Sequence, residues 1–277
     1  MIPTRRDLHF NLKPGSVSHW HAQGPYVTHF VNAMSIFFPD GERFFILTVR
    51  HYHDRITDPE LKKAVSAFIG HEAMHGREHE EYNRLLDQAG LPAGELEHKV
   101  RGFLNLLVQW LPPAALLSVT IAQEHFTAIL SEQVLTDPRL LAGADARLRA
   151  MWRWHALEET EHKAVAFDVY ETAVGRNAGA YALRCASLVL TTLGFLSLVL
   201  YYQQRLLQAD QRPHGWRDLR NYLKFMFVTP AMLPRLALPW LRYFRRDFHP
   251  WDHDNRHLLK EMVTLMASVQ QYPQKAA

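Results

Sequence analysis

The chain has 277 residues, of which 48% are hydrophobic, and a formal net charge of +3. It is long enough to bury a sizeable core, either as one large domain or as one domain with an appendage. Its one cysteine, Cys185, excludes an internal disulfide framework and fits a reducing compartment.

The composition favours helices throughout. Glycine is sparse, with 13 residues, and runs of Ala, Leu, Glu, Arg and Gln replace strand-like alternation of apolar and polar residues. We therefore predict an all-α fold. Residues 1–175 hold 17 Lys and Arg against 22 Asp and Glu (net −5) and 13 of the 17 histidines. Residues 176–250 hold 11 Lys and Arg against 3 Asp and Glu (net +8), which indicates an anionic partner for that segment.

Six helices are expected in the first 175 residues, after an irregular arm whose polar opening lacks the apolar run of a secretory signal. Their ranges, in chain order, are 26–38, 41–56, 59–89, 95–111, 114–135 and 145–175. Pro39 ends the first, because proline removes a helical hydrogen bond. Asp58 and Pro59 start the third, as N-cap and first helical residue. The pattern predicts an arm over 1–25 and a helical bundle over 26–175.

The composition changes beyond residue 175. Residues 185–202 carry no charge, and these 18 residues are at the short end for a transmembrane helix. We prefer a fully buried helix packed against the bundle. Residues 213–248 mix aromatic, proline and basic residues, and a membrane-surface or lipid-binding patch fits them as well as an ordinary helical cap does. With an amphipathic helix over 254–269, this part is expected to form an apolar, basic extension over 176–277.

Two Glu-x-x-His motifs carry the functional signal: Glu72 with His75, and Glu159 with His162. Residues three apart on a helix lie close together on its surface, so the carboxylate and the imidazole can reach one metal ion. Glu158 also lies near His162, but only Glu159 has the three-residue spacing. One such pair is weak, because Glu and His are common on exposed helices, whereas two pairs are harder to dismiss.

Two further glutamates stand at matching positions. Glu42 precedes Thr57 by 15 residues and Glu72 follows it by 15, so an antiparallel hairpin that turns there sets the two carboxylates level. In the second hairpin, Glu124 precedes the turn by about as many residues as Glu159 follows it, so these two carboxylates are also expected at one level. The result is a ring of four carboxylates and two imidazoles that point inward from four helices, as in di-iron carboxylate bundles.

This ligand pattern resembles the ferritin-like di-metal superfamily. The chain as a whole, including Phe248-His249-Pro250-Trp251-Asp252, is similar to a bacterial family of predicted metal-dependent hydrolases. The superfamily resemblance implies a four-helix bundle of two antiparallel hairpins, here joined by the helix over 95–111, with a helical appendage after it. It also implies two transition-metal ions. Fe is favoured, with Mn or Zn as alternatives, since the ligands are carboxylates and imidazoles without thiolates.

Three chemistries remain open. Four carboxylates with two histidines are the ligand set of ferritin-like oxidases and oxygenases, so the resemblance favours activation of O₂ to oxidise a hydrophobic, lipid-like substrate. The family name favours hydrolysis by a water that bridges two metals. His71, Glu72 and His75 also satisfy H-E-x-x-H, the zinc-hydrolase signature. That third alternative leaves Glu42 and Glu124 unexplained, and we prefer the oxygen chemistry.

The expected ligands fall into two sets. They are Glu42, Glu72 and His75 for one ion, and Glu124, Glu159 and His162 for the other. Glu72 and Glu159 are expected to bridge the ions as the catalytic carboxylates. His79, His155 and His71 are each either an extra ligand, a donor that orients a ligand, or an ordinary helix histidine.

Aromatic side chains on the same helices would keep the centre dry and accept a hydrophobic substrate. Phe45, Phe68 and Phe126 are the expected pocket residues, although core packing is the simpler account of any single one. The expected partner is a small hydrophobic or lipid-like substrate, with a membrane-surface contact through 185–246. No nucleic-acid partner is expected, because the basic residues form no recognisable module. A homodimer is compatible with the sequence, and we expect a cytoplasmic protein peripheral to the inner membrane.

Overall fold

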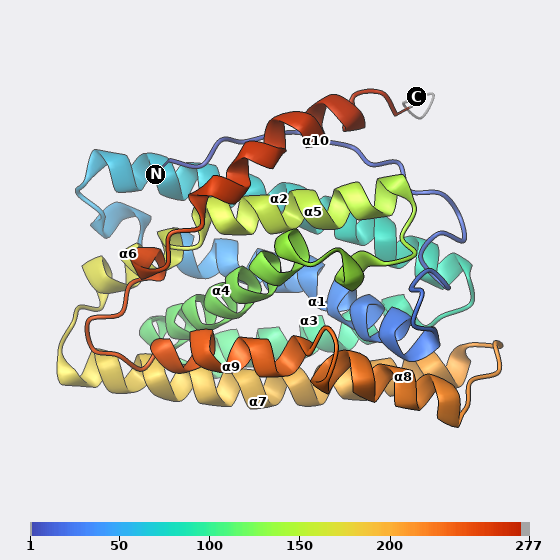
Figure 1. The fold of residues 1–277 in the computed structure, drawn as a ribbon. Helices are drawn as coiled ribbons and strands as arrows, with labels where there is room; N and C mark the ends of the chain where they lie inside the picture. The colour runs from blue at the N-terminus through green and yellow to red at the C-terminus, as the bar shows by residue number, and fades with distance from the viewer. Residues whose placement is uncertain (1, 273–277) are drawn as a thin grey trace.

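Four long helices form the body of the molecule, of which the computed structural model describes residues 2–272. Their bounds are α1 Pro25–Arg50, α2 Pro59–Gln88, α4 Pro113–Thr136 and α5 Ala146–His162. α1 packs along α2 and α4 along α5, and contacts of α1 with α4 and of α2 with α5 close the four helices around a shared interior (Figure 1). All regular structure in the described residues is helical, so the all-α prediction is confirmed.

The other helices surround this body. Their bounds are α3 Ala93–Trp110, α6 Val165–Ala173, α7 Ala178–Ala209, α8 Trp216–Phe227, α9 Met232–Arg242 and α10 Glu261–Val269. Short 3-10 turns lie at His53–Arg55, Pro138–Leu141, Pro250–Asp252 and Arg256–Lys260. α7 packs on α1 and α4 along the bottom of Figure 1, whereas α10 lies at the top beside α5.

Local capping explains where two of the body helices start. The side chain of Asp58 accepts a hydrogen bond from the backbone N–H of Glu60 at 2.9 Å, and Pro59 occupies the first position of α2, as predicted. Asp145 caps α5 in the same way, through the N–H of Leu148 at 2.9 Å. The first Glu-x-x-His motif lies in the middle of α2, and the second occupies the last turn of α5, which ends at His162.

The predicted break at Pro39 is wrong, because α1 runs through this residue without interruption. Pro39 has no N–H to donate to the carbonyl of Ser35, four residues earlier. That carbonyl instead accepts a hydrogen bond from Nδ2 of Asn83 on α2, at 3.2 Å. The neighbouring helix thus supplies the bond that proline removes, and the predicted helices over 26–38 and 41–56 are one element.

The single helix predicted over 145–175 is divided, since α5 ends at His162 and α6 begins at Val165. At the break, the ammonium of Lys163 is buried and donates to Oδ1 of Asn255 at 2.8 Å. The C-terminal segment is therefore attached to the body immediately after the second motif. The last predicted helix is also interrupted, because a 3-10 turn precedes α10.

α7 contains the uncharged residues 185–202 and extends beyond them at both ends. It is long and apolar enough to cross a membrane by length and composition, yet it lies along the four-helix body. Only 22% of its most apolar 18-residue window is buried, so the expectation of a fully buried helix is wrong. One face of α7 packs on α1 and α4, and the opposite face is exposed. Core residues come from both sides of residue 175, and the division into arm, bundle and extension stays a prediction.

The arm over residues 2–24 lies against α2 and α5. The backbone N–H of Phe10 donates to Oε2 of Glu78 on α2 at 3.1 Å, and the N–H of Ala22 donates to the carbonyl of Ala142 at 2.8 Å. Gly143 has a φ of +96°, and a Cβ there would lie 2.3 Å from the carbonyl oxygen of Trp20. Only glycine fits this close approach of the arm to the α4–α5 connection.

Candidate metal centre

The six expected ligands all lie in the interior of the four-helix body. α1 and α4 each contribute one glutamate, and α2 and α5 each contribute a Glu-x-x-His pair. All six side chains are at most 2% exposed: Glu42, Glu72, His75, Glu124, Glu159 and His162. The helices therefore bring together residues that are up to 120 positions apart in the sequence, from 42 to 162.

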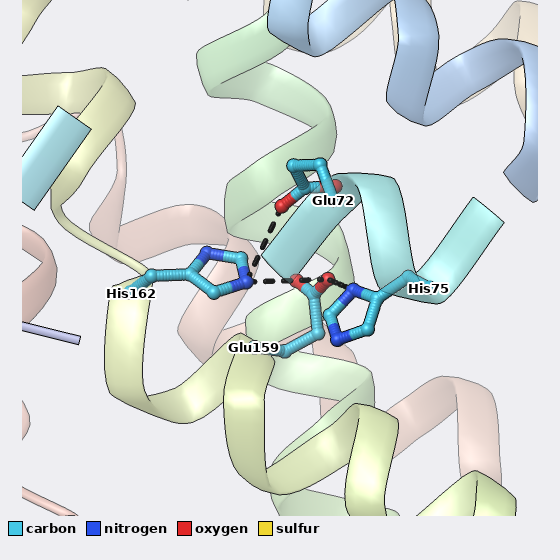
Figure 2. A group of neighbouring side chains, drawn as sticks. All are labelled: Glu72, His75, Glu159 and His162. Atoms are coloured by element: carbon cyan, nitrogen blue, oxygen red, sulfur yellow. Dashed lines mark ion pairs between the residues drawn. The ribbon is translucent and has the colours of Figure 1, made fainter. Parts of the chain in front are cut away.

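The two Glu-x-x-His pairs face each other at the middle of the cluster (Figure 2). One ligand atom from each of Glu72, His75, Glu159 and His162 lies within 4.8 Å of the others. Nε2 of His162 is 3.3 Å from Oε1 of Glu72 and 3.9 Å from Oε1 of Glu159. Nδ1 of His75 lies 3.7 Å from the same oxygen of Glu159. These separations are close to those around a transition-metal ion, whose ligand atoms lie about 2 Å from it.

A second group of possible ligands adjoins the first. Glu42, His79 and His155 each offer one atom within 4.8 Å of the other two. Nε2 of His155 lies 4.0 Å from Oε1 of Glu42 and 3.2 Å from Oε1 of Glu159, so Glu159 stands between the two groups. Ser35 contacts the far side of the second group, with its hydroxyl 2.9 Å from Nδ1 of His79.

This grouping differs from the expected division of ligands between two ions. Glu42 lies with the histidines of the second group, and not with Glu72 and His75. The reason is the register of the α1–α2 hairpin. A Cβ on Gly76, one turn after Glu72, would lie 3.2 Å from Oε2 of Glu42. Glu124 lies on the other side of the first group, with its Oε2 3.3 Å from Nδ1 of His162.

Buried polar atoms without hydrogen-bond partners are concentrated here. They comprise both carboxylate oxygens of Glu42, Glu72 and Glu124 and both ring nitrogens of His75 and His162. A buried polar group without a partner costs about 1–3 kcal/mol, and a charged one costs more. Metal ions would supply the missing partners. Carboxylate oxygens and imidazole nitrogens without thiolates suit Fe, Mn or Zn, so the residues present fit a metal centre.

Burial and mutual repulsion of the carboxylates disfavour negative charge in the cluster, so a nearby positive charge is favoured. Burial, reinforced by the neighbouring carboxylates, raises the pKa of Glu42 and of Glu72 well above the usual range. Burial also raises the pKa of Glu124 to about 7. Burial would lower the pKa of His162, but Glu159 and Glu124 outweigh it and raise that pKa to about 9. An excess of carboxylates around two imidazoles is the electrostatic setting that a divalent cation neutralises.

Glu158, which the spacing argument set aside, also joins the cluster. Its Oε2 lies 3.2 Å from Nε2 of His75 and 3.7 Å from Nδ1 of His71. Its Oε1 lies 3.3 Å from the guanidinium of Arg6, which the arm brings to the site. Burial raises the pKa of Glu158 to about 8 although Arg6 opposes it. The sequence pattern contains no signal for Arg6, because it lies in a segment without helical periodicity.

His71 is turned partly away from the centre. Its Nε2 donates to the carbonyl oxygen of Thr4 at 2.8 Å, and it belongs to neither group of possible ligand atoms. Burial lowers the pKa of His71 to about 3, so the ring is neutral near pH 7. In a zinc site of the H-E-x-x-H type, only Nδ1 of His71 would be free to bind the ion.

An apolar cavity of about 380 Å³ reaches the centre from the α7 side. It is enclosed by α1, α3, α4 and α7, and Glu42 and Thr127 are part of its lining. Of the three expected pocket residues, Phe45 lines this cavity, whereas Phe68 and Phe126 lie outside its lining.

A family model described as "Predicted metal-dependent hydrolase" matches residues 4–254 of the chain. No curated protein and no solved structure matches it. The matched range contains Arg6, both groups of possible ligands, Glu124 and Glu158, so the whole candidate centre lies within it.

Proposed function

Because the chain belongs to the family of predicted metal-dependent hydrolases, we propose that the buried cluster holds two metal ions and that the protein is a di-metal hydrolase. The observation that carries this proposal is the set of buried, unpartnered oxygen and nitrogen atoms on five of the six expected ligands. The placement of the ligands also supports a ferritin-like centre. Such centres take one Glu from each of two helices and a Glu-x-x-His pair from each of two others, as α1, α4, α2 and α5 supply them here.

Each group of possible ligands is proposed to hold one ion, with Glu159 shared between them. Metal ions held there would supply Lewis-acid chemistry, polarising a substrate oxygen and lowering the pKa of a bound water. The chain itself orients the shared carboxylate. The hydroxyl of Thr127 donates to Oε2 of Glu159 at 2.5 Å, and Nε2 of His155 lies 3.2 Å from Oε1.

Oxidation of an apolar substrate by O₂, with iron at the same centre, is the second candidate. One specific observation favours it: the cavity that reaches Glu42 is lined almost entirely by hydrocarbon groups. Such a lining suits a substrate that is apolar along most of its length. The ligand set of carboxylates and imidazoles is compatible with both candidates.

Metal content and two activity assays test the proposal. The purified protein is expected to contain about two transition-metal ions per chain, and Glu72→Gln with Glu159→Gln should remove most of them. Hydrolysis of a series of p-nitrophenyl esters, compared with oxygen uptake after anaerobic loading with Fe(II), separates the two candidates.

Two results would contradict the proposal. A protein that binds no metal would exclude both candidates. One zinc ion per chain, with hydrolysis lost in His71→Ala but kept in Glu124→Gln, would favour the single-zinc alternative built on His71, Glu72 and His75.

A further inference from the structure

The apolar cavity beside the centre opens at the surface between α3 and α7. At its inner end lies Glu42, which is 1% exposed, with Thr127 nearby in the lining. At its outer end lie Phe103 of α3, which is 48% exposed, and Leu190 of α7, which is 69% exposed. The cavity therefore connects the exposed face of α7 with the ligand cluster.

We propose that this cavity binds the alkyl chain of the substrate and directs the reacting group at its end toward Glu42. This inference rests on the proposed function, because it takes the occupant of the cavity to be the substrate. The lining between mouth and centre is mostly Leu, Phe, Val, Met, Ala and Gly from four helices, and Gln123, Ser187 and Thr191 add few polar atoms that could pair with a polar ligand. The volume of about 380 Å³ is in the range of small-molecule sites, roughly 300–1,000 Å³.

Small residues create the space. Gly41 on α1, Ala115 on α4 and Gly194 on α7 all line the cavity. A Cβ added to Gly41 or Gly194 would meet no atom within 4 Å, so neither glycine is required by close helix packing. In the interior of a helix, glycine is less favourable than alanine by about 1 kcal/mol. The absence of a side chain at these two positions leaves the cavity open.

Filling the cavity tests the proposal. The full-length, metal-loaded protein is titrated with a fluorescent polyene fatty acid, which is then displaced with dodecanoic acid or dodecan-1-ol. We expect saturable binding near one equivalent for the unmodified protein. Gly194→Phe, from the α7 side, and Ala115→Phe, from the α4 side, should each weaken binding by about tenfold or more, because excluding roughly two methylene groups has that effect.

Gly102→Phe is the matched control. Gly102 also lies in a helix, α3, and a Cβ there also meets no atom within 4 Å, but it does not line the cavity. It should bind the probe as the unmodified protein does. Absence of saturable binding, or equal affinity in all four proteins with native helical content by circular dichroism, would overturn the proposal.

The same proteins separate this inference from the proposed function. Probe binding is read without turnover, and metal content is measured on each variant. Loss of probe binding with metals retained is the expected result for the filled variants. If the unmodified protein binds the probe but hydrolyses no ester, the proposed hydrolysis fails while the alkyl-chain site stands.

An independent observation concerns the surface around the mouth. On α3, the exposed large apolar side chains follow helical spacing, with Phe103, Leu106 and Trp110 on one stripe. On α7, which borders the same cavity as α3, Leu190, Leu193, Leu200 and Tyr201 are exposed. We define these seven residues as the apolar face. An exposed apolar patch of this kind indicates a surface that another apolar phase covers.

We also infer that the apolar face docks on the surface of a lipid bilayer. Three features favour a bilayer over a second copy of the chain. The face is continuous with the cavity mouth, through Phe103 and Leu190. Within residues 176–250, whose net charge is +8, the exposed side chains of Arg217, Arg220 and Lys224 on α8 suit anionic headgroups. Trp110 and Trp216 are both about three-quarters exposed, as in interfacial helices, where aromatic residues sit at headgroup level.

Vesicle flotation tests the docking. The protein should float with vesicles of phosphatidylcholine and phosphatidylglycerol, and less with phosphatidylcholine alone. Leu106→Glu with Leu193→Glu should abolish flotation. Val263→Glu is the control, because Val263 is 76% exposed but lies on α10, at the opposite side of the molecule (Figure 1). Equal flotation of both variants, or a dimer in light scattering that only Leu106→Glu with Leu193→Glu dissociates, would overturn the inference.

Discussion

Glu159 is the side chain on which the two groups of histidines converge. Its Oε1 lies 3.2 Å from Nε2 of His155 and 3.7 Å from Nδ1 of His75, and its Oε2 accepts from Thr127. Burial would raise its pKa, but the charge of His162 and the hydrogen bonds of His155 and Thr127 outweigh burial and lower it. Glu159 is therefore held as a carboxylate, as a shared metal ligand requires.

Gly76 offers a test of the second group that changes no ligand. A methyl group at this position would lie 3.2 Å from Oε2 of Glu42, closer than an ordinary contact. We expect Gly76→Ala to displace the Glu42 carboxylate and to lower metal content, although alanine is the better helix former. Metal analysis after dialysis measures the effect, with Gly102→Ala as the control. Full metal content in Gly76→Ala would show that Glu42 does not bind metal in the position described.

His21 lies far from the centre and predicts a pH dependence of stability. Its Nδ1 accepts from the N–H of Gln23 at 3.1 Å, and its Nε2 donates to the carbonyl of Leu140 at 3.2 Å, so the neutral ring is fully hydrogen-bonded. Burial lowers the pKa of His21 to about 4, from 6.5. Between these two values the unfolded chain binds more protons, so His21 makes the protein less stable as the pH falls from about 6.5 to about 4.

The variant His21→Gln should therefore lose less stability on acidification. From pH 7 to pH 5, the unfolding free energy should fall by about 2 kcal/mol less in the variant than in the unmodified protein. Urea denaturation at the two pH values measures this difference. Equal losses in the two proteins would mean that His21 is not held neutral.

At the level of elements, the N-terminal arm completes the site as well as covering it. Arg6 lies 3.3 Å from Glu158 and 2.6 Å from Glu161, both on α5. Thr4 accepts from His71 on α2. One irregular segment thus contacts both helices that carry the Glu-x-x-His motifs. The arm balances part of the carboxylate charge that the centre accumulates.

Removing the Arg6 guanidinium should leave Glu161, which is 7% exposed, without the cation that lies 2.6 Å from it. Breaking a buried pair from one side typically costs about 3–5 kcal/mol, so Arg6→Met should lower the melting temperature strongly. In the double variant with Glu161→Gln, part of that loss should be recovered, because the unpaired carboxylate is gone. Thermal unfolding by circular dichroism reads both effects. Additive losses in the double variant would show that Arg6 and Glu161 are not coupled.

In the α1–α2 hairpin, a side chain of α2 supplies a hydrogen bond that the backbone of α1 lacks. Asn83 on α2 donates to the Ser35 carbonyl left free by Pro39, and the Ser35 hydroxyl contacts both Asn83 and His79 at 2.9 Å. The same small network keeps α1 continuous and holds a histidine of the second group. A helix that broke at Pro39 would not carry Glu42 on the same axis as the residues before it.

On the scale of the whole molecule, the fold buries a charged centre in the middle of an apolar body. The interior holds Glu42, Glu72, Glu124, Glu158 and Glu159 within a few ångströms of several imidazoles. Such a concentration of carboxylates opposes folding unless cations or protons neutralise it. Metal binding and folding should therefore be linked.

Metal removal should lower stability for this reason. Dialysis against a chelator should reduce the melting temperature, and restoring Mn(II) or Fe(II) should raise it again. At a thousandfold excess of metal over Kd, the free energy of unfolding should increase by about 4 kcal/mol. The double variant Glu42→Gln, Glu124→Gln should respond less to the chelator, and its metal-free form should be more stable than the metal-free unmodified protein. Differential scanning calorimetry tests both, and a melting temperature indifferent to the chelator would refute the linkage.

The sequence by itself determined the features that depend on local periodicity. Helical composition predicted the all-α fold, Asp58 and Pro59 marked the start of α2, and spacing along a helix placed Glu72 beside His75 and Glu159 beside His162. The matched spacing across the two hairpin turns predicted Glu42 and Glu124 in the interior where both are buried. These inferences held because each depends on short-range geometry that helices share.

The tertiary structure alone decided what one element supplies to another. Continuity of α1 through Pro39 depends on Asn83 from α2, and the place of Glu158 in the cluster depends on Arg6 from an aperiodic arm. The apolar cavity exists only where α1, α3, α4 and α7 meet. Contacts of this kind join residues far apart in the chain, and no periodic pattern records which side chain satisfies a freed carbonyl or a buried charge.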